Sequence, residues 1–188
     1  MHPFINALPG ISSKRYLELG ILNGITLGLV KAREKVGVDI SPVGEPTFLG
    51  TTDAYFANLP ADERFDVVFI DACHEFRQVL RDFNNSVAHL NPGGVIFCHD
   101  MAPKGVENTN PRLCGDAYKL CWLAPPDGMK WAIYGGDDAG GAVFYNPHAL
   151  ELANLPADAS YEAFERDFRA LAVTTHEEFL TLCRLIGA

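Results

Sequence analysis

The sequence lacks several features that define whole classes of protein. Its first twenty residues, MHPFINALPGISSKRYLELG, contain no basic segment followed by a long apolar run, so we expect no signal peptide. No run of about 18 apolar residues occurs, which argues against a membrane-spanning helix. The cysteines are odd in number and form no CxxC pair, so they predict neither a disulfide framework nor a structural zinc site. We therefore expect a reducing, cytoplasmic location.

Basic residues are also scarce. The chain has 15 Lys and Arg against 24 Asp and Glu, a formal net charge of -9. Such a surface repels phosphate backbones and anionic lipid, so nucleic acid and membranes are poor candidate partners. With 48% hydrophobic and 21% charged residues, the composition is that of a globular protein, and 188 residues can bury a core without a metal or disulfide staple.

Short apolar segments alternate with helical patterns through the first two thirds of the chain. The expected strands are Arg15–Leu19, Val36–Asp39, Thr47–Gly50, Asp66–Asp71 and Val95–His99, and the expected helices are Thr26–Glu34 and Glu75–Leu90, the latter stopped by Asn91-Pro92-Gly93-Gly94. Strands that are apolar on both faces, separated by helices, predict an α/β fold. We expect a Rossmann-like, doubly wound, mostly parallel sheet with helices on both faces.

One connection is too short for this scheme. Only the seven residues Ile40–Pro46 separate the second and third expected strands. A parallel crossover normally needs about a dozen residues or more. Either the third strand is misplaced, or this crossover has no helix.

The pattern changes in the last third of the chain. A helix is expected over Gly115–Trp122, and Lys130–Tyr134 and Gly141–Tyr145 predict an antiparallel hairpin at the sheet edge. Two more helices are expected over Tyr161–Leu171 and Thr175–Ile186, capped by Ser160 and by Thr174 or Thr175. We expect residues 1–147 to form the main domain and residues 148–188 to form a C-terminal helical extension packed on it.

Polar or glycine-rich segments follow all five expected parallel strands. Ligands of open parallel sheets bind beyond the carboxyl ends of the strands. Those ends carry Glu18-Leu-Gly20-Ile-Leu-Asn23-Gly24, Asp39, Thr51-Thr52-Asp53, Asp71-Ala72-Cys73-His74 and His99-Asp100. A polar segment at the end of any single strand is explained as a solvated loop, but polar segments at the ends of all five strands predict one binding site.

The first loop indicates the kind of ligand. Its GxxxG spacing differs from the GxGxxG of dinucleotide-binding loops. An acid at Glu18 would repel a pyrophosphate and suit a cationic ligand with an ammonium group, while Asp39 is placed to bind ribose hydroxyls. A ligand with a ribose and a positive centre but no phosphate matches S-adenosylmethionine. A nicotinamide-dependent oxidoreductase would have the same fold, but its glycine spacing differs from the one in this chain.

Several segments together resemble class I S-adenosylmethionine-dependent methyltransferases. They are YLELGILNGITL, VGVDISP, TTDAYF, FDVVFIDACHEFRQVLRDFNNSVAHLNPGGVIFCHDMAP and LCGDAYK. The resemblance covers roughly residues 14–145 and is greatest to the bacterial methyltransferase family 24. Ala72 departs from that pattern, which usually has glycine there.

The resemblance implies roles for individual residues. Glu18, Gly20 and Gly24 would hold the amino-acid part of the cofactor, and Asn23 belongs to the same loop. Asp39 would bind the ribose. The remaining cofactor-binding positions are Thr52 and Asp53 near the adenine and Asp71 between cofactor and acceptor.

A divalent metal is a further expectation, because catechol-type methyltransferases hold magnesium at the ends of the fourth and fifth strands. The corresponding residues are Asp71, His99 and Asp100, and the expected metal is magnesium or manganese. The imidazole either shifts the preference towards manganese, iron or zinc or does not bind the metal directly. His74 matches the position of the base in those enzymes, so the predicted catalytic residues are His74, Asp71 and His99.

Simpler roles remain open for these residues. Asp71 and His74 could pair and cap the helix that follows, and His99 could be a hydrogen-bonded structural histidine beside Asp100. Cys73 and Cys98 are interpreted as packing residues.

The sequence as a whole predicts a methyltransferase that modifies an oxygen of a small hydroxylated metabolite or sugar, with or without a divalent metal. The alternative is a protein that binds the cofactor in a regulatory or assembly role without catalysis. The expected partner is a small-molecule acceptor, and the C-terminal extension is a candidate lid or homo-oligomer contact.

Overall fold

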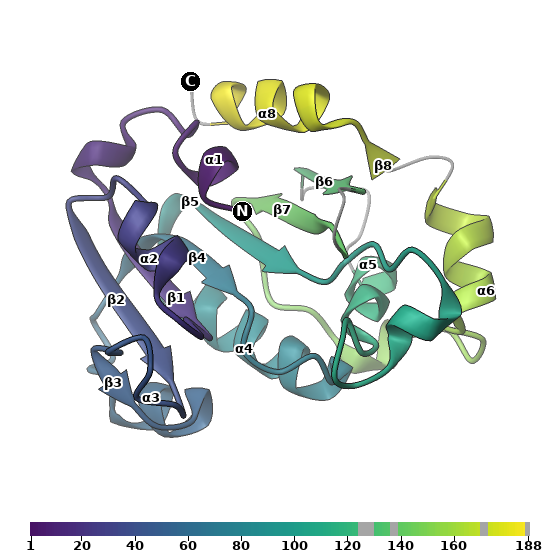
Figure 1. The fold of residues 1–188 in the computed structure, drawn as a ribbon, viewed down its shortest axis with the longest axis horizontal. Helices are drawn as coiled ribbons and strands as arrows, with labels where there is room; N and C mark the ends of the chain where they lie inside the picture. Colours follow the sequence, from purple (N-terminus) through teal and green to yellow (C-terminus); the bar gives the residue numbers. More distant parts are fainter. Residues whose placement is uncertain (124–129, 136–138, 170–172, 187–188) are drawn as a thin grey trace.

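The computed structural model describes residues 1–123, 130–135, 139–169 and 173–186, and a single mixed sheet forms its centre (Figure 1). The strands lie in the order β3-β2-β1-β4-β5-β7-β6-β8. Their bounds are β1 (Arg15–Leu19), β2 (Glu34–Asp39), β3 (Phe48–Leu49), β4 (Phe65–Ile70), β5 (Leu90–His99), β6 (Lys130–Tyr134), β7 (Gly141–Tyr145) and β8 (Val173–Thr174).

The first five strands in this order are all parallel, and β7 is antiparallel to both β5 and β6. The predicted Rossmann-like, mostly parallel sheet with an antiparallel pair is therefore confirmed. The short strand β8 comes from the C-terminal segment and pairs in parallel with β6, so it extends the sheet beyond the predicted hairpin.

Helices cover both faces of the sheet (Figure 1). One layer contains α1 (His2–Ile5), α2 (Ile25–Leu29) and α8 (His176–Leu185), and the other contains α3 (Thr52–Asn58), α4 (Phe76–Ala88), α5 (Leu120–Leu123) and α6 (Tyr161–Phe164). The side chains of β4 show why both layers form. Val67 and Phe69 are buried under the first layer, while Val68 and Ile70 are buried under the second, because successive side chains of a strand point to opposite faces.

Two helices are shorter than the sequence predicts. The helix after β1 ends at Leu29 instead of Glu34, because Glu34 already pairs with Arg15 in the sheet. Helix α4 ends at Ala88, and the Asn91-Pro92-Gly93-Gly94 segment that follows is part of β5. The register between β4 and β5 shifts in this region, between Phe65 and Val67. Such an irregularity accommodates a proline, which cannot donate to a regular ladder.

The short crossover between β2 and β3 has no helix. Residues 40–47 form a loop, and β3 pairs with β2 in parallel, with Val38 opposite Phe48. The third strand was therefore predicted correctly, and the interpretation that this crossover has no helix is the right one.

The C-terminal segment packs against the rest of the chain through aromatic side chains. Phe179 of α8 contacts Phe4 with ring centroids 4.8 Å apart, and Phe164 of α6 contacts Tyr118 at 5.1 Å. Helix α6 continues as a π-helix over Glu165–Arg169, and the predicted helix end at Leu171 lies outside the described residues.

Both predicted helix caps in this segment are present. The Ser160 hydroxyl accepts a hydrogen bond from the Ala163 amide, and Thr175 and Glu178 form a capping box. In the described part of the chain, no helix combines the length and apolar character needed to cross a membrane.

Candidate functional site

Two adjoining cavities open at the carboxyl ends of the parallel strands. The larger has a volume of about 610 Å³ and the smaller about 280 Å³. Gly20, Asp39, Ile40 and Ala72 line both of them. One elongated ligand can therefore occupy the smaller cavity and extend into the larger one.

Gly20 allows the ends of β1 and β4 to approach each other closely. Its φ of +83° is in the left-handed region, and a Cβ at this position would lie 2.2 Å from the carbonyl oxygen of Asp71. No other residue type fits such a contact. Gly24, the second glycine of the motif, has a φ of +73° and packs against the backbone of Gly44 in the β2–β3 loop. The glycines thus shape the loop through backbone contacts.

Asp39 at the end of β2 holds the glycine loop in place. Its Oδ2 accepts hydrogen bonds from the amides of Ile21 and Leu22 at 2.9 and 2.8 Å, and its Oδ1 accepts from Ser41 at 2.7 Å. A carboxylate offers about four acceptor positions. Asp39 therefore keeps acceptor capacity toward the cavities while it orders the loop.

The smaller cavity lies over the start of α3. Thr51, Thr52 and Asp53 line it together with Gln78 of α4. The Thr51 hydroxyl caps α3 by accepting from the amide of Ala54 at 3.1 Å. The structure thus brings Thr52 and Asp53, predicted to lie near the adenine, to a cavity that Asp39 also lines.

The two cysteines interpreted as packing residues differ. Cys98 is buried, as expected. Cys73 is exposed and lines the smaller cavity, so the packing interpretation is wrong for Cys73. It follows β4 in the connection to α4, where the chain passes over the sheet edge instead of through the core.

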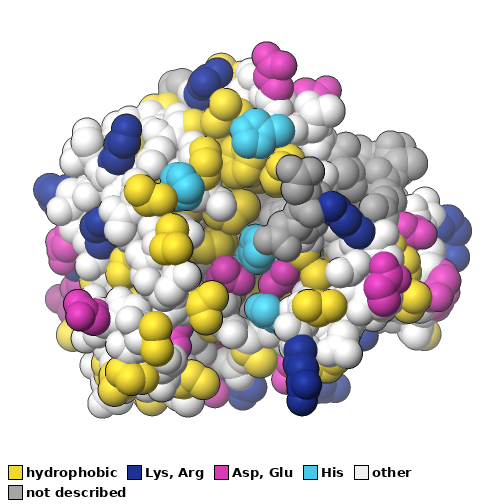
Figure 2. Space-filling view, in the orientation of Figure 1, with side chains coloured by type: hydrophobic (Ala, Val, Ile, Leu, Met, Phe, Trp, Pro, Cys, Tyr) yellow, Lys and Arg dark blue, Asp and Glu magenta, His cyan; other side chains and the backbone are white. Residues whose placement is uncertain are grey.

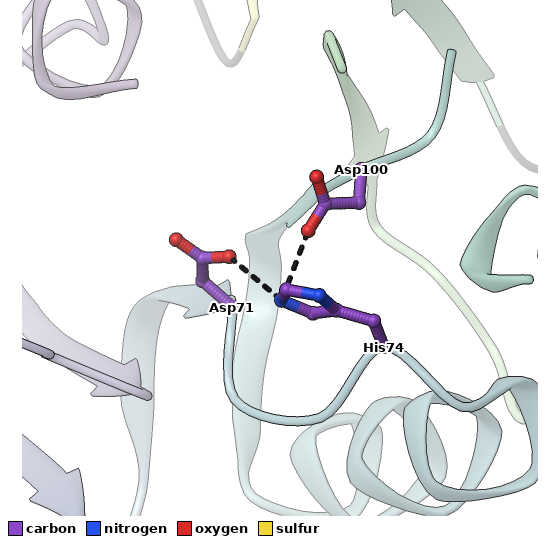
Figure 3. Close-up of side chains that lie close together, drawn as sticks. All are labelled: Asp71, His74 and Asp100. Atoms are coloured by element: carbon purple, nitrogen blue, oxygen red, sulfur yellow. Dashed lines mark ion pairs between the residues drawn. The ribbon is translucent and has the colours of Figure 1, made fainter. Parts of the chain in front are cut away.

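Two acids and two histidines form a cluster on the wall of the larger cavity. This acid–imidazole cluster consists of Asp71, His74, His99 and Asp100. His74 Nε2 lies 3.0 Å from Asp100 Oδ2 and 3.8 Å from Asp71 Oδ1. Figure 3 shows the two carboxylates on either side of this contact. His99 Nδ1 lies 3.2 Å from Asp71 Oδ1 and 3.4 Å from Asp100 Oδ1. In Figure 2, histidine and acidic side chains lie side by side near the centre of this face.

The close packing of these charges shifts their pKa values. Burial raises the pKa of Asp71, but the hydrogen bonds with His74 and His99 outweigh it and hold the pKa below its ordinary value. The bond to Asp71 raises the pKa of His74. Burial lowers the pKa of His99, but Asp100 and Asp71 reverse this effect and bring the pKa to about 10. His99 is therefore an imidazolium at neutral pH in the absence of a metal.

The backbone around the cluster is held in unusual conformations. Asp100 is 5% exposed and has a φ of +61°, a left-handed conformation that is uncommon for a residue with a side chain.

The carbonyl of His74 accepts a hydrogen bond from the Asp116 amide at 3.0 Å, and Asp116 Oδ1 accepts from the Phe76 amide at 2.7 Å. Asp116 therefore caps α4, and Asp71 and His74 do not.

Three predicted cofactor-binding residues line neither cavity: Gly24, whose contacts are given above, Glu18 and Asn23. Glu18 is 2% exposed inside β1, where its Oε2 accepts a hydrogen bond from the Tyr16 hydroxyl at 2.7 Å. Asn23 is exposed, and its Oδ1 accepts from the Ile25 amide at 3.2 Å. In the described residues, neither side chain lines the two cavities, so their contact with a cofactor stays a prediction.

The structure also adds residues that the sequence did not single out. Lys104, Asn108 and Arg112 line the larger cavity from the loop after β5, and Gln78 lines the smaller one. The loop has no periodic pattern from which its fold could be predicted. Gln78 lies in the first turn of α4, and no sequence signal singled it out.

Part of the chain matches the sequence model of a known family. Residues 38–101 match the sequence model of a methyltransferase domain, family 24. The matched segment runs from the end of β2 past the end of β5 and contains the acid–imidazole cluster. No curated protein matches the chain.

Solved structures with the same fold include cofactor-bound Rv0187 from MTB, with a TM-score of 0.59, 17% identity and 78% of each chain covered. An O-methyltransferase from Bacillus cereus in complex with SAH has a TM-score of 0.56 and 20% identity, over 78% of this chain and 80% of that one. TomG from Streptomyces achromogenes, an O-methyltransferase of tomaymycin synthesis in complex with SAM, has a TM-score of 0.56 and 15% identity, over 78% and 79%. The predicted resemblance to class I S-adenosylmethionine-dependent methyltransferases is confirmed.

Proposed function

We propose that the protein transfers the methyl group of S-adenosylmethionine to an oxygen of a small hydroxylated molecule. The observation that carries this proposal is the junction of the two cavities. Their shared lining at Gly20, Asp39 and Ala72 leads directly to the acid–imidazole cluster. A protein that only binds the cofactor has no evident use for such a cluster.

The cavities suggest how the two substrates are arranged. The adenine would occupy the smaller cavity near Thr52 and Asp53, the ribose would bind Asp39, and the amino-acid part would follow the glycine loop. This leaves the far part of the larger cavity, beside Lys104 and Arg112, for the acceptor. The acid–imidazole cluster then lies between cofactor and acceptor.

Methyl transfer is an in-line displacement in which proximity and orientation supply much of the acceleration. The acceptor oxygen forms a bond to the methyl carbon while the carbon–sulfur bond breaks, and the sulfonium becomes a neutral thioether. The acceptor hydroxyl loses its proton. His74 is partly exposed and lines the larger cavity, with its Nε2 3.0 Å from Asp100 Oδ2, so in the absence of a metal it is the candidate base.

The same cluster fits a divalent cation. Donor atoms of Asp71, His74 and Asp100 all lie within 4.8 Å of one another. Two carboxylates and an imidazole favour manganese, iron or zinc, since magnesium prefers oxygen ligands alone. His74 is the nitrogen donor of this group, whereas the family resemblance implies His99, which also lies beside both carboxylates. A bound cation would lower the pKa of the acceptor hydroxyl and fix its orientation.

Isothermal titration calorimetry with S-adenosylmethionine, its demethylated product S-adenosylhomocysteine and NAD tests the cofactor. We expect micromolar binding of the first two and none of NAD, and NAD binding alone would contradict the proposal. Asp39→Asn should weaken binding, whereas Asp62→Asn, at an exposed site, should not.

Transfer is tested by S-adenosylhomocysteine release with catechol and other vicinal diols as acceptors, with manganese or with EDTA. Suppression by EDTA supports the cation, and full activity in chelator supports His74 as a metal-free base. Cofactor binding without any transfer would favour the non-catalytic alternative. A small-molecule acceptor agrees with the net charge of -9, and homo-oligomerisation stays a prediction.

A further inference from the structure

Within the described residues, both basic side chains that line the two cavities come from one loop. Lys104 and Arg112 lie in the segment that follows β5, and both line the larger cavity, whereas no Lys or Arg of the described residues lines the smaller one. The chain as a whole has a net charge of -9, so this wall reverses the sign of the overall charge. The proposed arrangement leaves this part of the larger cavity to the acceptor, so the basic side chains bear on which acceptor binds.

The loop that carries Arg112 is fixed on the acid–imidazole cluster. The Asp116 amide donates to the His74 carbonyl at 3.0 Å, and Gly115 lies so close that a Cβ there would be 2.1 Å from the same oxygen. Leu113 forms a backbone hydrogen bond with the His74 side chain. Arg112 therefore directly precedes a residue that contacts the candidate base, so the loop holds Arg112 at a defined place beside the reacting hydroxyl of the acceptor.

Two side chains of this loop have hydrogen-bond donors that no described residue accepts from. Arg112 is exposed, and its backbone amide donates to Asn110 Oδ1 at 2.9 Å, but its guanidinium has no ion pair or hydrogen bond in the described part of the chain. The side-chain amide of Asn108 is unpartnered there as well, while its backbone carbonyl accepts from the buried Cys114 at 3.0 Å. A planar guanidinium binds carboxylates and phosphates through paired, parallel hydrogen bonds. These donors therefore suit an oxyanion.

We propose that the acceptor carries an oxyanion, a carboxylate or a phosphate, near the hydroxyl that is methylated, and that Arg112 binds this group together with the Asn108 amide. A guanidinium only donates hydrogen bonds, so it selects an anion over a neutral group of the same shape. Lys104 adds positive charge on the same cavity wall. The inference rests on the proposed function, because it concerns the acceptor of the proposed transfer.

The carboxylates of the acid–imidazole cluster do not bar an anion from the cavity. Asp71 lies 3.2 Å from the His99 imidazole, and Asp100 lies 3.0 Å from the His74 imidazole. A divalent cation at the cluster, or the sulfonium of the cofactor, would add positive charge at the same place. Repulsion from the acids weakens with distance and is screened by salt, whereas the guanidinium would contact the oxyanion directly. The direct contact therefore decides the preference.

The experiment measures how matched acceptors bind to the protein saturated with S-adenosylhomocysteine, by isothermal titration calorimetry with manganese present. Protocatechuate and hydrocaffeate carry a carboxylate at different distances from the same diol, and their neutral amides differ from them mainly in charge. We expect at least one carboxylate to bind about tenfold more tightly than its amide, since charge-assisted hydrogen bonds are stronger than neutral ones. The phosphonate analogue of protocatechuate separates the two oxyanions: tighter binding of the phosphonate assigns the group as a phosphate, and weaker binding assigns it as a carboxylate.

Arg112→Gln removes the charge and keeps a polar side chain. It should reduce the preference for the anion severalfold and leave the affinities for the amides and for S-adenosylhomocysteine unchanged. Arg112→Lys keeps the charge without the planar fork and should restore part of the preference. Arg77→Gln is the matched control, because Arg77 is exposed on α4 and lines neither cavity. It makes the same change in net charge and should leave the preference unchanged.

The possible results separate the inference from the proposed function. Equal affinities for the anions and the amides, no binding of any acceptor, or a preference that Arg112→Gln leaves intact would overturn the inference, while the proposed function stands on cofactor binding. Weaker binding of S-adenosylhomocysteine to Arg112→Gln would assign the guanidinium to the cofactor and overturn the inference as well. A wild-type protein that does not bind S-adenosylhomocysteine would overturn both.

Discussion

Replacing Glu18 by glutamine should stabilise the protein, and the gain should grow with pH. Glu18 is 2% exposed in β1, with one hydrogen bond from the Tyr16 hydroxyl. Burial raises its pKa from 4.5 to about 7, and the nearby Asp71 adds to the increase. In the unfolded chain the same carboxyl ionises near its ordinary value. The folded protein therefore holds the Glu18 proton over a pH range in which the unfolded chain has already lost it.

The magnitude follows from linkage. Between pH 4.5 and about 7 the folded state binds more protons at Glu18 than the unfolded state does, so the free energy of unfolding falls as pH rises. Each pH unit of difference between the two pKa values is worth about 1.4 kcal/mol, which gives about 3 kcal/mol by pH 8. Glutamine has no charge to bury, and its oxygen still accepts from Tyr16.

Urea unfolding of wild type and Glu18→Gln at several values between pH 5 and pH 8 measures this difference. The free energies of unfolding should differ by less than about 1 kcal/mol at pH 5 and by about 3 kcal/mol at pH 8. Glu151→Gln removes the same charge from an exposed site and serves as the control. Parallel curves for wild type and Glu18→Gln across the range would refute the reasoning.

A buried acid that destabilises the fold near neutral pH is a feature of functional sites. If Glu18 faces the cofactor ammonium once the glycine loop adjusts, Glu18→Gln should bind S-adenosylmethionine at least tenfold more weakly while being more stable. Gained stability with unchanged affinity would leave Glu18 a structural residue.

Three further changes test other parts of the site. Gly20→Ala places a Cβ 2.2 Å from the Asp71 carbonyl oxygen at a φ of +83°, so thermal unfolding followed by circular dichroism should show a melting temperature several degrees lower. Asp39→Ala removes the acceptor of three backbone amides, so calorimetry should show S-adenosylhomocysteine binding weakened at least tenfold, and unchanged affinity would place the ribose elsewhere. Manganese binding at pH 7 should release protons, because a metal-bound His74 must be neutral and because His99, with a pKa of about 10, shares both carboxylates with the metal. Calorimetry in two buffers of different ionisation enthalpy measures the release, and no release would contradict metal binding at this cluster.

Hydrophobic patterning predicted most of the fold. The strands that become β1, β4, β6 and β7 were expected within one residue of their bounds, because each has the β-branched or aromatic content of a buried strand. The errors lie where tertiary pairing overrides local preference. Glu34 and Lys35 are good helix formers, but they pair with Arg15 and Tyr16 in the sheet.

The site could be predicted in position but less well in contacts. Topology brings the ends of parallel strands to one edge, so Asp39, Asp71 and Asp100 were expected together, and the structure places them around one cavity. No comparable rule predicts which contacts the irregular segments make. Asp116 accepts a hydrogen bond from Lys119, caps α4 and supports the backbone of His74.

The division of roles between the two histidines shows the limit of transferring roles by family resemblance. The resemblance assigns His99 to the metal and His74 to the proton, yet in the structure each imidazole contacts both Asp71 and Asp100. Two carboxylates this close repel each other unless positive charge lies between them. An imidazolium and a divalent cation are two ways to provide that charge, and they compete for the same oxygens. The state of the cluster therefore depends on pH and on the metal concentration together, and the sequence order of the two histidines determines neither.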